Sequence, residues 1–221
     1  MKDHKKLISV FLFAAAFAFV ESAVVVYLRA IYYPEGFSFP LHIMRTPHLL
    51  VELFRELSTI VMLVSVGLLT GSTRWQKFSY FLVAFGVWDI FYYVWLKVVL
   101  NWPSSMFDWD ILFLIPLPWI GPVIAPILIS LMMIAAGLLI IQQEASGKSF
   151  RPSLSAWLIS GTASFVILYT FVQDTEATLH AQLPQRYRYE FFIPALVLYL
   201  FTMMLVFRRN GKREHEGSPI R

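Results

Sequence analysis

The residues of this sequence that could do chemistry are ionisable side chains inside long apolar runs. They are Glu21, Glu52, Arg55, Glu56, Asp89 and Lys97, with His48 at the edge of one such run. A charge at the centre of a membrane helix costs about 2.5–3.5 kcal/mol on the insertion scale, so these side chains should face one another or a water-filled cavity. The sequence therefore predicts a polar site enclosed by apolar helices.

Helical spacing aligns several of these groups. Side chains four residues apart lie on one face of a helix. The spacing occurs in two sets of three, His48, Glu52 and Glu56, and Asp89, Tyr93 and Lys97. Two helices should therefore each turn a polar face toward the site.

Acids outnumber bases in the predicted site, with Glu21, Glu52, Glu56 and Asp89 against Arg55 and Lys97. Like charges one turn apart repel unless a base, a bound proton or a cation relieves them. A carboxyl buried among apolar side chains is suited to general acid/base catalysis. The predicted catalytic groups are Glu52, Glu56, Asp89, Glu21 and His48.

A second set of residues is predicted to bind substrate. Arg55 and Lys97 could orient carboxylates or an anionic head group, and the Tyr93 hydroxyl could donate a hydrogen bond. The others come from a following segment expected to form a lid. The full set is Arg55, Tyr93, Lys97, Trp102, Asp108 and Asp110.

Two other interpretations of the same residues stay open. In the first, an internal ion-pair network fastens the helices, with Arg55 paired to Glu21 and Lys97 paired to Asp89 or Glu56. In the second, a divalent metal binds to carboxylates and one histidine. Its ligands would be His48, Glu52, Glu56, Glu21 and Asp89, with His180 able to approach from a loop. The cofactor, if any, is not identified by the sequence.

Composition assigns the chain to the membrane proteins. Of its 221 residues 58% are hydrophobic and 14% are charged, with a formal net charge of +4, a mean hydropathy of +0.65 and no cysteine. A soluble domain carries about a quarter charged residues. No glycine-rich phosphate loop and no basic block with interleaved aromatics is present, so a nucleic-acid partner is not expected. The expected partner is the lipid bilayer, with a lipid or apolar small molecule as ligand.

About 20 apolar residues are needed to cross a bilayer as a helix, and six segments qualify. The chain is therefore predicted to be an all-α, polytopic helix bundle with a single transmembrane domain over residues 1–207. The first segment resembles a signal peptide at Ala16-Phe17-Ala18, but its apolar run continues to Val26 and we expect it to remain. The predicted spans are residues 7–28, 47–70, 78–100, 121–141, 154–172 and 190–207.

Basic residues predict the orientation. With the N-terminus in the cytoplasm, twelve Lys and Arg lie in inner segments and four in outer ones, which is the bias expected of a chain with both termini inside. The inner residues are Lys2, Lys5, Lys6, Arg74, Lys77, Lys148, Arg151, Arg208, Arg209, Lys212, Arg213 and Arg221. We expect a plasma (inner) membrane protein whose basic tail, residues 208–221, is disordered in the cytoplasm.

The stretch from Asn101 to Pro126 interrupts the helical pattern. Five prolines and three tryptophans make it unsuited to one straight helix. We interpret it as a Pro/Trp-rich re-entrant or capping segment on the outer face, which is allowed at membrane depth where protein or water satisfies its backbone.

These features favour a membrane-embedded enzyme that works from the outer face on a lipid or isoprenoid-like substrate by carboxylate acid/base chemistry. A small proton-coupled transporter is an alternative, although the inner halves of the spans carry almost no charge. A non-catalytic membrane subunit or assembly factor, held together by intramembrane ion pairs, is the other.

Overall fold

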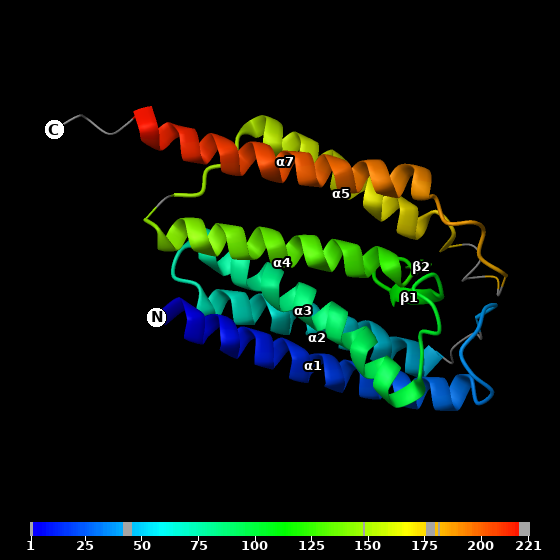
Figure 1. Ribbon diagram of the computed structural model, residues 1–221. Helices are drawn as coiled ribbons and strands as arrows, with labels where there is room; N and C mark the ends of the chain where they lie inside the picture. The colour runs from blue at the N-terminus through cyan, green and yellow to red at the C-terminus, as the bar shows by residue number, and fades with distance from the viewer. Residues whose placement is uncertain (1, 42–45, 148, 176–179, 181, 217–221) are drawn as a thin grey trace.

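The computed structural model describes residues 2–41, 46–147, 149–175, 180 and 182–216, which form six helices and one β-hairpin (Figure 1). The helices are α1 (Lys2–Tyr32), α2 (Thr46–Thr70), α3 (Arg74–Leu100), α4 (Ile124–Ala145), α5 (Leu154–Val172) and α7 (Tyr189–Glu216). The strands are β1 (Trp109–Phe113) and β2 (Trp119–Pro122), which pair antiparallel with Asp110 opposite Gly121.

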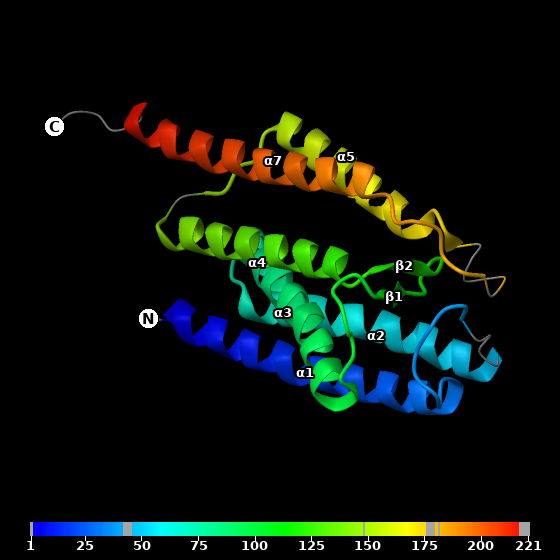
Figure 2. The ribbon, with the colours of Figure 1, turned by 45° about the vertical axis from the view of Figure 1, so that its right-hand side comes forward.

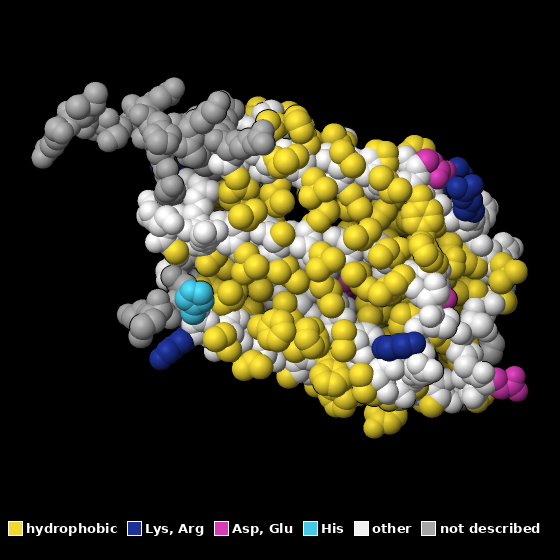
Figure 3. Space-filling view, in the orientation of Figure 1, with side chains coloured by type: hydrophobic (Ala, Val, Ile, Leu, Met, Phe, Trp, Pro, Cys, Tyr) yellow, Lys and Arg dark blue, Asp and Glu magenta, His cyan; other side chains and the backbone are white. Residues whose placement is uncertain are grey.

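Five of the helices, α1, α3, α4, α5 and α7, are long and apolar enough to cross a membrane. Hydrophobic side chains cover most of the middle of the face in Figure 3, and most of the charged side chains in view lie toward its ends. Helix α2 has 25 residues and includes Glu52, Arg55 and Glu56. The chain thus has the helices of a membrane protein.

The helix ends follow local signals in the sequence. The hydroxyl of Thr73 accepts a hydrogen bond from the Gln76 amide at the start of α3, and Ser153 does the same for Ala156 before α5. Asn101 adopts a left-handed conformation with φ of 53° and ends α3. The bounds of α5 coincide with the predicted span, while the other helices differ from theirs by a few residues at one or both ends, and α7 extends further.

The helices form two layers (Figures 1 and 2). Helix α3 lies at the centre of the first and packs against α1, α2 and α4, while α5 and α7 form the second. Glycines allow α3 and α4 to lie close together. A Cβ atom added at Gly86 would lie 2.6 Å from the backbone oxygen of Ser130, and one added at Gly137 would lie 2.8 Å from the backbone oxygen of Ser79. Small residues permit such close approach of membrane helices.

The six helices agree with the all-helical expectation, and the Pro/Trp-rich segment adds one short β-hairpin to them. The Pro/Trp-rich segment does not enter the bundle as a helix, because its two short apolar runs pair with each other as β1 and β2. Pro116 and Pro118 lie in the turn between them, where a missing backbone N–H removes no ladder bond. The hairpin sits at the end of the molecule opposite both termini (Figure 1).

Helix α7 extends into the segment that the sequence predicts to be the basic tail. The predicted disordered tail begins at Arg208, whereas α7 continues to Glu216. Residues 217–221 lie outside the described residues.

Candidate functional site

A polar cavity of about 220 Å³ lies at the hairpin end of the first layer. Its walls come from α1, α2, α3, the hairpin and the chain that follows α1. Seven charged residues line it: Glu21, Arg29, Glu52, Arg55, Glu56, Asp89 and Asp110. All four predicted intramembrane acids are among them, so the structure brings these acids together.

The centre of the polar cavity is an ion-pair triad of Arg55 with Glu21 and Glu52. The guanidinium Nη2 lies 2.7 Å from the Glu52 Oε2, its Nε donates to the same oxygen at 2.9 Å, and its Nη1 contacts the Glu21 carboxylate. The Thr59 hydroxyl donates to Glu21 at 3.1 Å. The triad joins α1 to α2 and confirms the predicted pairing of Arg55 with Glu21.

Arg29 is a member of the site that the sequence interpretation missed. It is only 7% exposed, and its Nη2 donates to the Asp110 carboxylate at 3.1 Å. Its guanidinium also lies over the rings of Phe37, at 4.2 Å, and Trp102, at 3.8 Å. The available signal was its place eight residues after Glu21, on the same side of α1.

Asp110, on β1, is 2% exposed, and burial raises the pKa of this carboxyl above its ordinary value. The positive charge of Arg29 and a hydrogen bond with the Tyr93 hydroxyl oppose that rise. The hairpin is therefore tied to α1 and α3 through one carboxyl.

Glu56 ties the hairpin to α2. Its two carboxylate oxygens accept hydrogen bonds from the Leu114 amide at 3.0 and 2.8 Å. Leu114 follows β1, at the start of the turn. The Leu114 N–H is not part of the two-stranded ladder, and a buried N–H without an acceptor is costly. The charged Glu56 carboxylate provides that acceptor.

Asp89 differs from the other acids of the polar cavity. It accepts a hydrogen bond from the Ser130 hydroxyl of α4 at 2.8 Å and, among the residues that the structure describes, has no ion pair. Its side chain is half-buried, and the surface it exposes faces interior space. Within the described part of the chain, Asp89 is thus the acid of this site that a neutral hydroxyl stabilises in place of a cation.

The predicted pairing of Lys97 with Asp89 or Glu56 is wrong. Lys97 is exposed, and its Nζ donates to the backbone oxygens of Asn101 at 3.3 Å and Pro103 at 3.0 Å. Lys97 lies in the last turn of α3, so its amine reaches the backbone oxygens that follow the helix instead of the interior of the site. Lysines in the last turn of a helix also favour carbonyl partners.

Other predicted residues lie at or beyond the edge of the polar cavity. His48 is exposed and hydrogen bonds the Tyr32 hydroxyl at 2.7 Å. Asp108 lies outside: partial burial acts to raise its pKa, but hydrogen bonds from Ser104 and Ser105 outweigh this and lower it. Trp102 contacts the site through Arg29.

The proposed metal ligands do not form a metal centre. Within the described part of the chain, no group of three or more His, Cys, Asp or Glu side chains is arranged to hold a metal ion. Arg55 stands between Glu21 and Glu52 and takes the place that a cation would occupy. His180 is exposed on the loop before α7.

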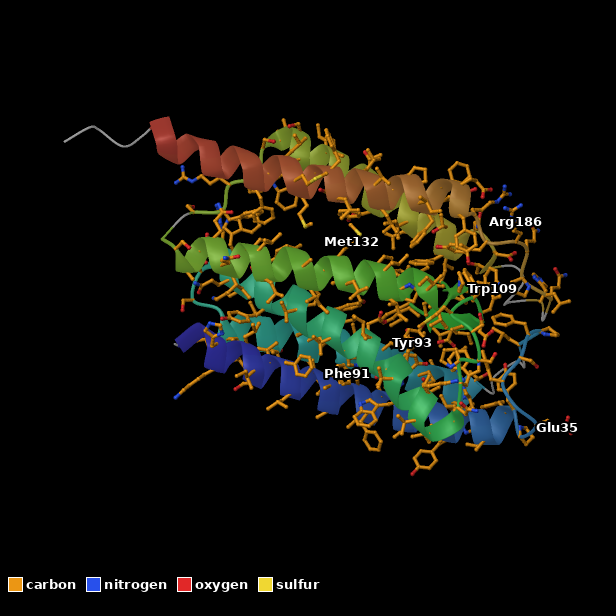
Figure 4. All side chains as sticks on the ribbon, in the orientation of Figure 1. Glu35, Phe91, Tyr93, Trp109, Met132 and Arg186 are labelled. Atoms are coloured by element: carbon orange, nitrogen blue, oxygen red, sulfur yellow. The ribbon has the colours of Figure 1, made fainter. Side chains whose placement is uncertain are left out.

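A second, larger space adjoins the polar cavity. This apolar chamber of about 590 Å³ lies between the α3 and α4 side of the first layer and the α5 and α7 layer. Asp89, Leu112 and Phe113 line both spaces. Figure 4 shows Met132 on α4 at the chamber and Tyr93 nearer to the polar cavity.

The site therefore combines charged, mutually paired side chains with one acid that faces an apolar space. Comparison of the chain with protein-family models, with curated proteins and with solved structures found no match to any of them.

Proposed function

We propose that this is a six-span protein of the plasma membrane with both termini in the cytoplasm and its polar cavity toward the outer side. The excess of Lys and Arg in the predicted inner segments supports this orientation. The fold is compatible with it, because both termini lie at the end of the molecule away from the hairpin (Figure 1).

The absence of cysteine makes the orientation simple to test. Ser72→Cys lies in the turn between α2 and α3, and Glu35→Cys lies in the loop after α1, at the opposite end. An impermeant maleimide should label Glu35→Cys in intact cells and Ser72→Cys only after permeabilisation. The reverse pattern would overturn the orientation.

We further propose that the protein is a membrane-embedded enzyme that acts on a lipid or isoprenoid-like substrate by carboxylate acid/base chemistry. One observation carries this proposal: Asp89, which lacks an ion pair among the described residues, lines both the polar cavity and the apolar chamber. A reacting group held there would meet a carboxyl able to accept or return a proton, while its apolar part stays out of water.

The remaining charged groups then have supporting roles. Arg55 holds Glu21 and Glu52 in place, and Arg29 and Glu56 hold the hairpin over the cavity. Glu52 and Glu56 line the same wall as the triad and are the next acid/base candidates. Catalytic groups held by such neighbours keep the geometry that proton transfer requires.

The test is complementation of a strain that lacks this chain. Asp89→Asn keeps the size of the side chain and removes its basic oxygen, so growth should fail while the membrane holds wild-type amounts of protein. Asp108→Asn is the matched control, because Asp108 lies outside the polar cavity. Full complementation by each of the single variants Asp89→Asn, Glu52→Gln and Glu56→Gln would contradict the enzyme proposal.

A non-catalytic subunit is the second candidate, and the ion pairs favour it. Arg55 joins α1 to α2, and Arg29 joins α1 to the hairpin. In that case the acids serve assembly, and a partner protein should purify with the chain at a fixed ratio. Loss of that partner on Arg55→Met, with full complementation by Asp89→Asn, would favour this candidate over the enzyme.

A further inference from the structure

The apolar chamber has the dimensions of a hydrocarbon chain. On α4 its lining runs from Pro126 to Ile140, a separation of fourteen positions that rises about 21 Å at 1.5 Å per residue. That length is about two thirds of the 30 Å hydrocarbon core of a bilayer. The volume of about 590 Å³ lies within the range of pockets that enclose a small-molecule ligand.

Among the described residues that line the chamber, Asp89 is the one with a charge, and it ends the α3 lining that begins at Trp75. Asp89 and Ser130 lie where it meets the polar cavity, and the opposite end is formed by Trp75, Phe150 and Phe207. An amphiphile would therefore bind in one direction, with its polar end at Asp89. The chain would lie along α4.

The chamber opens sideways, between the two layers. Figure 3 shows an opening in the apolar face between α4 and α7, and hydrophobic side chains surround it. Helix α7 has few contacts with α4, whereas it packs extensively against α5. Because this face carries the apolar surface of membrane-crossing helices, a lipid of the bilayer is the occupant that would enter from this side.

The charges at the polar end select the chemistry of the head group. Five carboxyls and two guanidinium groups line the polar cavity. Arg29 is ion-paired with Asp110, and Arg55 with Glu21 and Glu52, so carboxylates already balance both positive charges. The surplus of acids disfavours a phosphate, although the Nη1 of Arg29 has no hydrogen-bond partner among the described residues. Asp89 instead presents a carboxyl oxygen, which accepts a hydrogen bond from a hydroxyl or an ammonium group.

We propose that the apolar chamber binds one hydrocarbon chain of a bilayer lipid whose polar end is a hydrogen-bond donor, a hydroxyl or an amine, placed at Asp89. This inference rests on the proposed enzyme and names its substrate class as a single-chain amphiphile without a phosphate. The chain-binding chamber itself does not depend on the chemistry assigned to Asp89.

Photolabelling of the full chain in lipid nanodiscs tests the proposal. The probes are hexadecanol, hexadecylamine and hexadecyl phosphate, each with a diazirine at the middle of the chain. The alcohol and the amine should label the α4 peptide that contains Met132 and Met133, both of which line the chamber. The phosphate should label it about tenfold less, a difference of about 1.4 kcal/mol in binding.

Chamber-filling variants provide the decisive comparison. Gly161 lines the chamber, and a Cβ atom added there meets nothing within 4 Å, so Gly161→Trp can fill the space without striking backbone. Ala136→Phe fills it from α4. Both should lower labelling about tenfold. Leu158→Trp is the control on α5, because Leu158 is 63% exposed and does not line the chamber.

Three results would overturn the proposal: labelling that survives both filling variants, labelling by the phosphate equal to that by the amine, or amine labelling unchanged in Asp89→Asn. The failure of the enzyme is a separate result. Suppose that the filling variants abolish labelling, that amine labelling falls in Asp89→Asn, and that Asp89→Asn complements fully. The site for the hydrocarbon chain is then supported, and the acid/base chemistry is contradicted.

Discussion

Replacing Arg55 with methionine tests whether the triad holds α1 and α2 together. Methionine keeps much of the side-chain length and removes the charge. The change would delete the 2.7 Å contact with Glu52 and the contact with Glu21. Both acids would then be left without a cation, at 3% and 7% exposure. The hydrogen bond from Thr59 would still reach Glu21.

The expected cost follows from burial. Removing one partner of a buried ion pair costs about 3–5 kcal/mol, because the remaining charge stays out of water. Arg188 supplies the comparison, since its Nη1 lies 3.6 Å from the Glu190 carboxylate with both side chains about half exposed. Such exposed pairs contribute about 0–1 kcal/mol. We expect Arg55→Met to lose several times more stability than Arg188→Met.

The free energy of unfolding is measured in mixed micelles by titration with dodecyl sulfate, followed by tryptophan fluorescence. A triple variant that adds Glu21→Gln and Glu52→Gln to Arg55→Met should recover most of the loss, because replacing a whole buried ion pair is often nearly neutral. The reasoning is refuted if Arg55→Met unfolds at the same dodecyl sulfate fraction as Arg188→Met. It is also refuted if the triple variant is no more stable than the single one.

Three further predictions use the same unfolding assay, amide hydrogen exchange or tryptophan fluorescence. Gly86→Leu should cost about 1–3 kcal/mol, because its side chain overpacks the close contact between α3 and α4, whereas Gly161→Ala should change stability by less than about 0.5 kcal/mol; equal losses would contradict the close-packing argument. Glu56→Gln should cost about 1.5–3 kcal/mol by weakening the bond to the Leu114 amide, which should also exchange its hydrogen faster; unchanged exchange would count against the anchor. The pKa of Asp108 is lowered in the folded protein, so its stabilising effect is present above the ordinary pKa of about 3.9 and is lost as the pH falls below that value. We expect tryptophan fluorescence to change over this acid range in the wild type and not in Asp108→Asn. A change that persists in Asp108→Asn would exclude Asp108 as its cause.

The helices were predictable because their signals are local. Runs of about twenty apolar residues define each of them, and Ser153 and Gln173 flank α5 where the sequence placed its ends. The hairpin was not predictable in the same way. Its strands of five and four residues are too short to show a clear alternation, and they depend on pairing with each other and on contacts with α2 and α5.

Ion pairs of the polar cavity were predictable where the cost of an isolated charge in the membrane requires a partner. They were not predictable where the partner depends on the tertiary structure. The cost of isolated intramembrane charge brought Glu21 and Arg55 together across 34 positions of sequence, as expected. Arg29 could not be placed, because its partner Asp110 is 81 positions away on a strand that the sequence did not reveal. Lys97 was misplaced because its position in the last turn of α3 brings its amine to the backbone oxygens of Asn101 and Pro103.

The hairpin is the common neighbour of the two spaces. Arg29 and Glu56 hold it from the polar cavity, while the ring of Trp119 stacks on Phe171 of α5 at 6.3 Å and the Thr175 hydroxyl donates to the Pro118 oxygen at 3.1 Å. A ligand that shifts the hairpin when it binds in one of the two spaces also changes the shape of the other space. Thermodynamic linkage makes this effect reciprocal, so the factor by which a chain in the chamber alters the affinity for a polar ligand equals the factor by which that ligand alters the affinity for the chain.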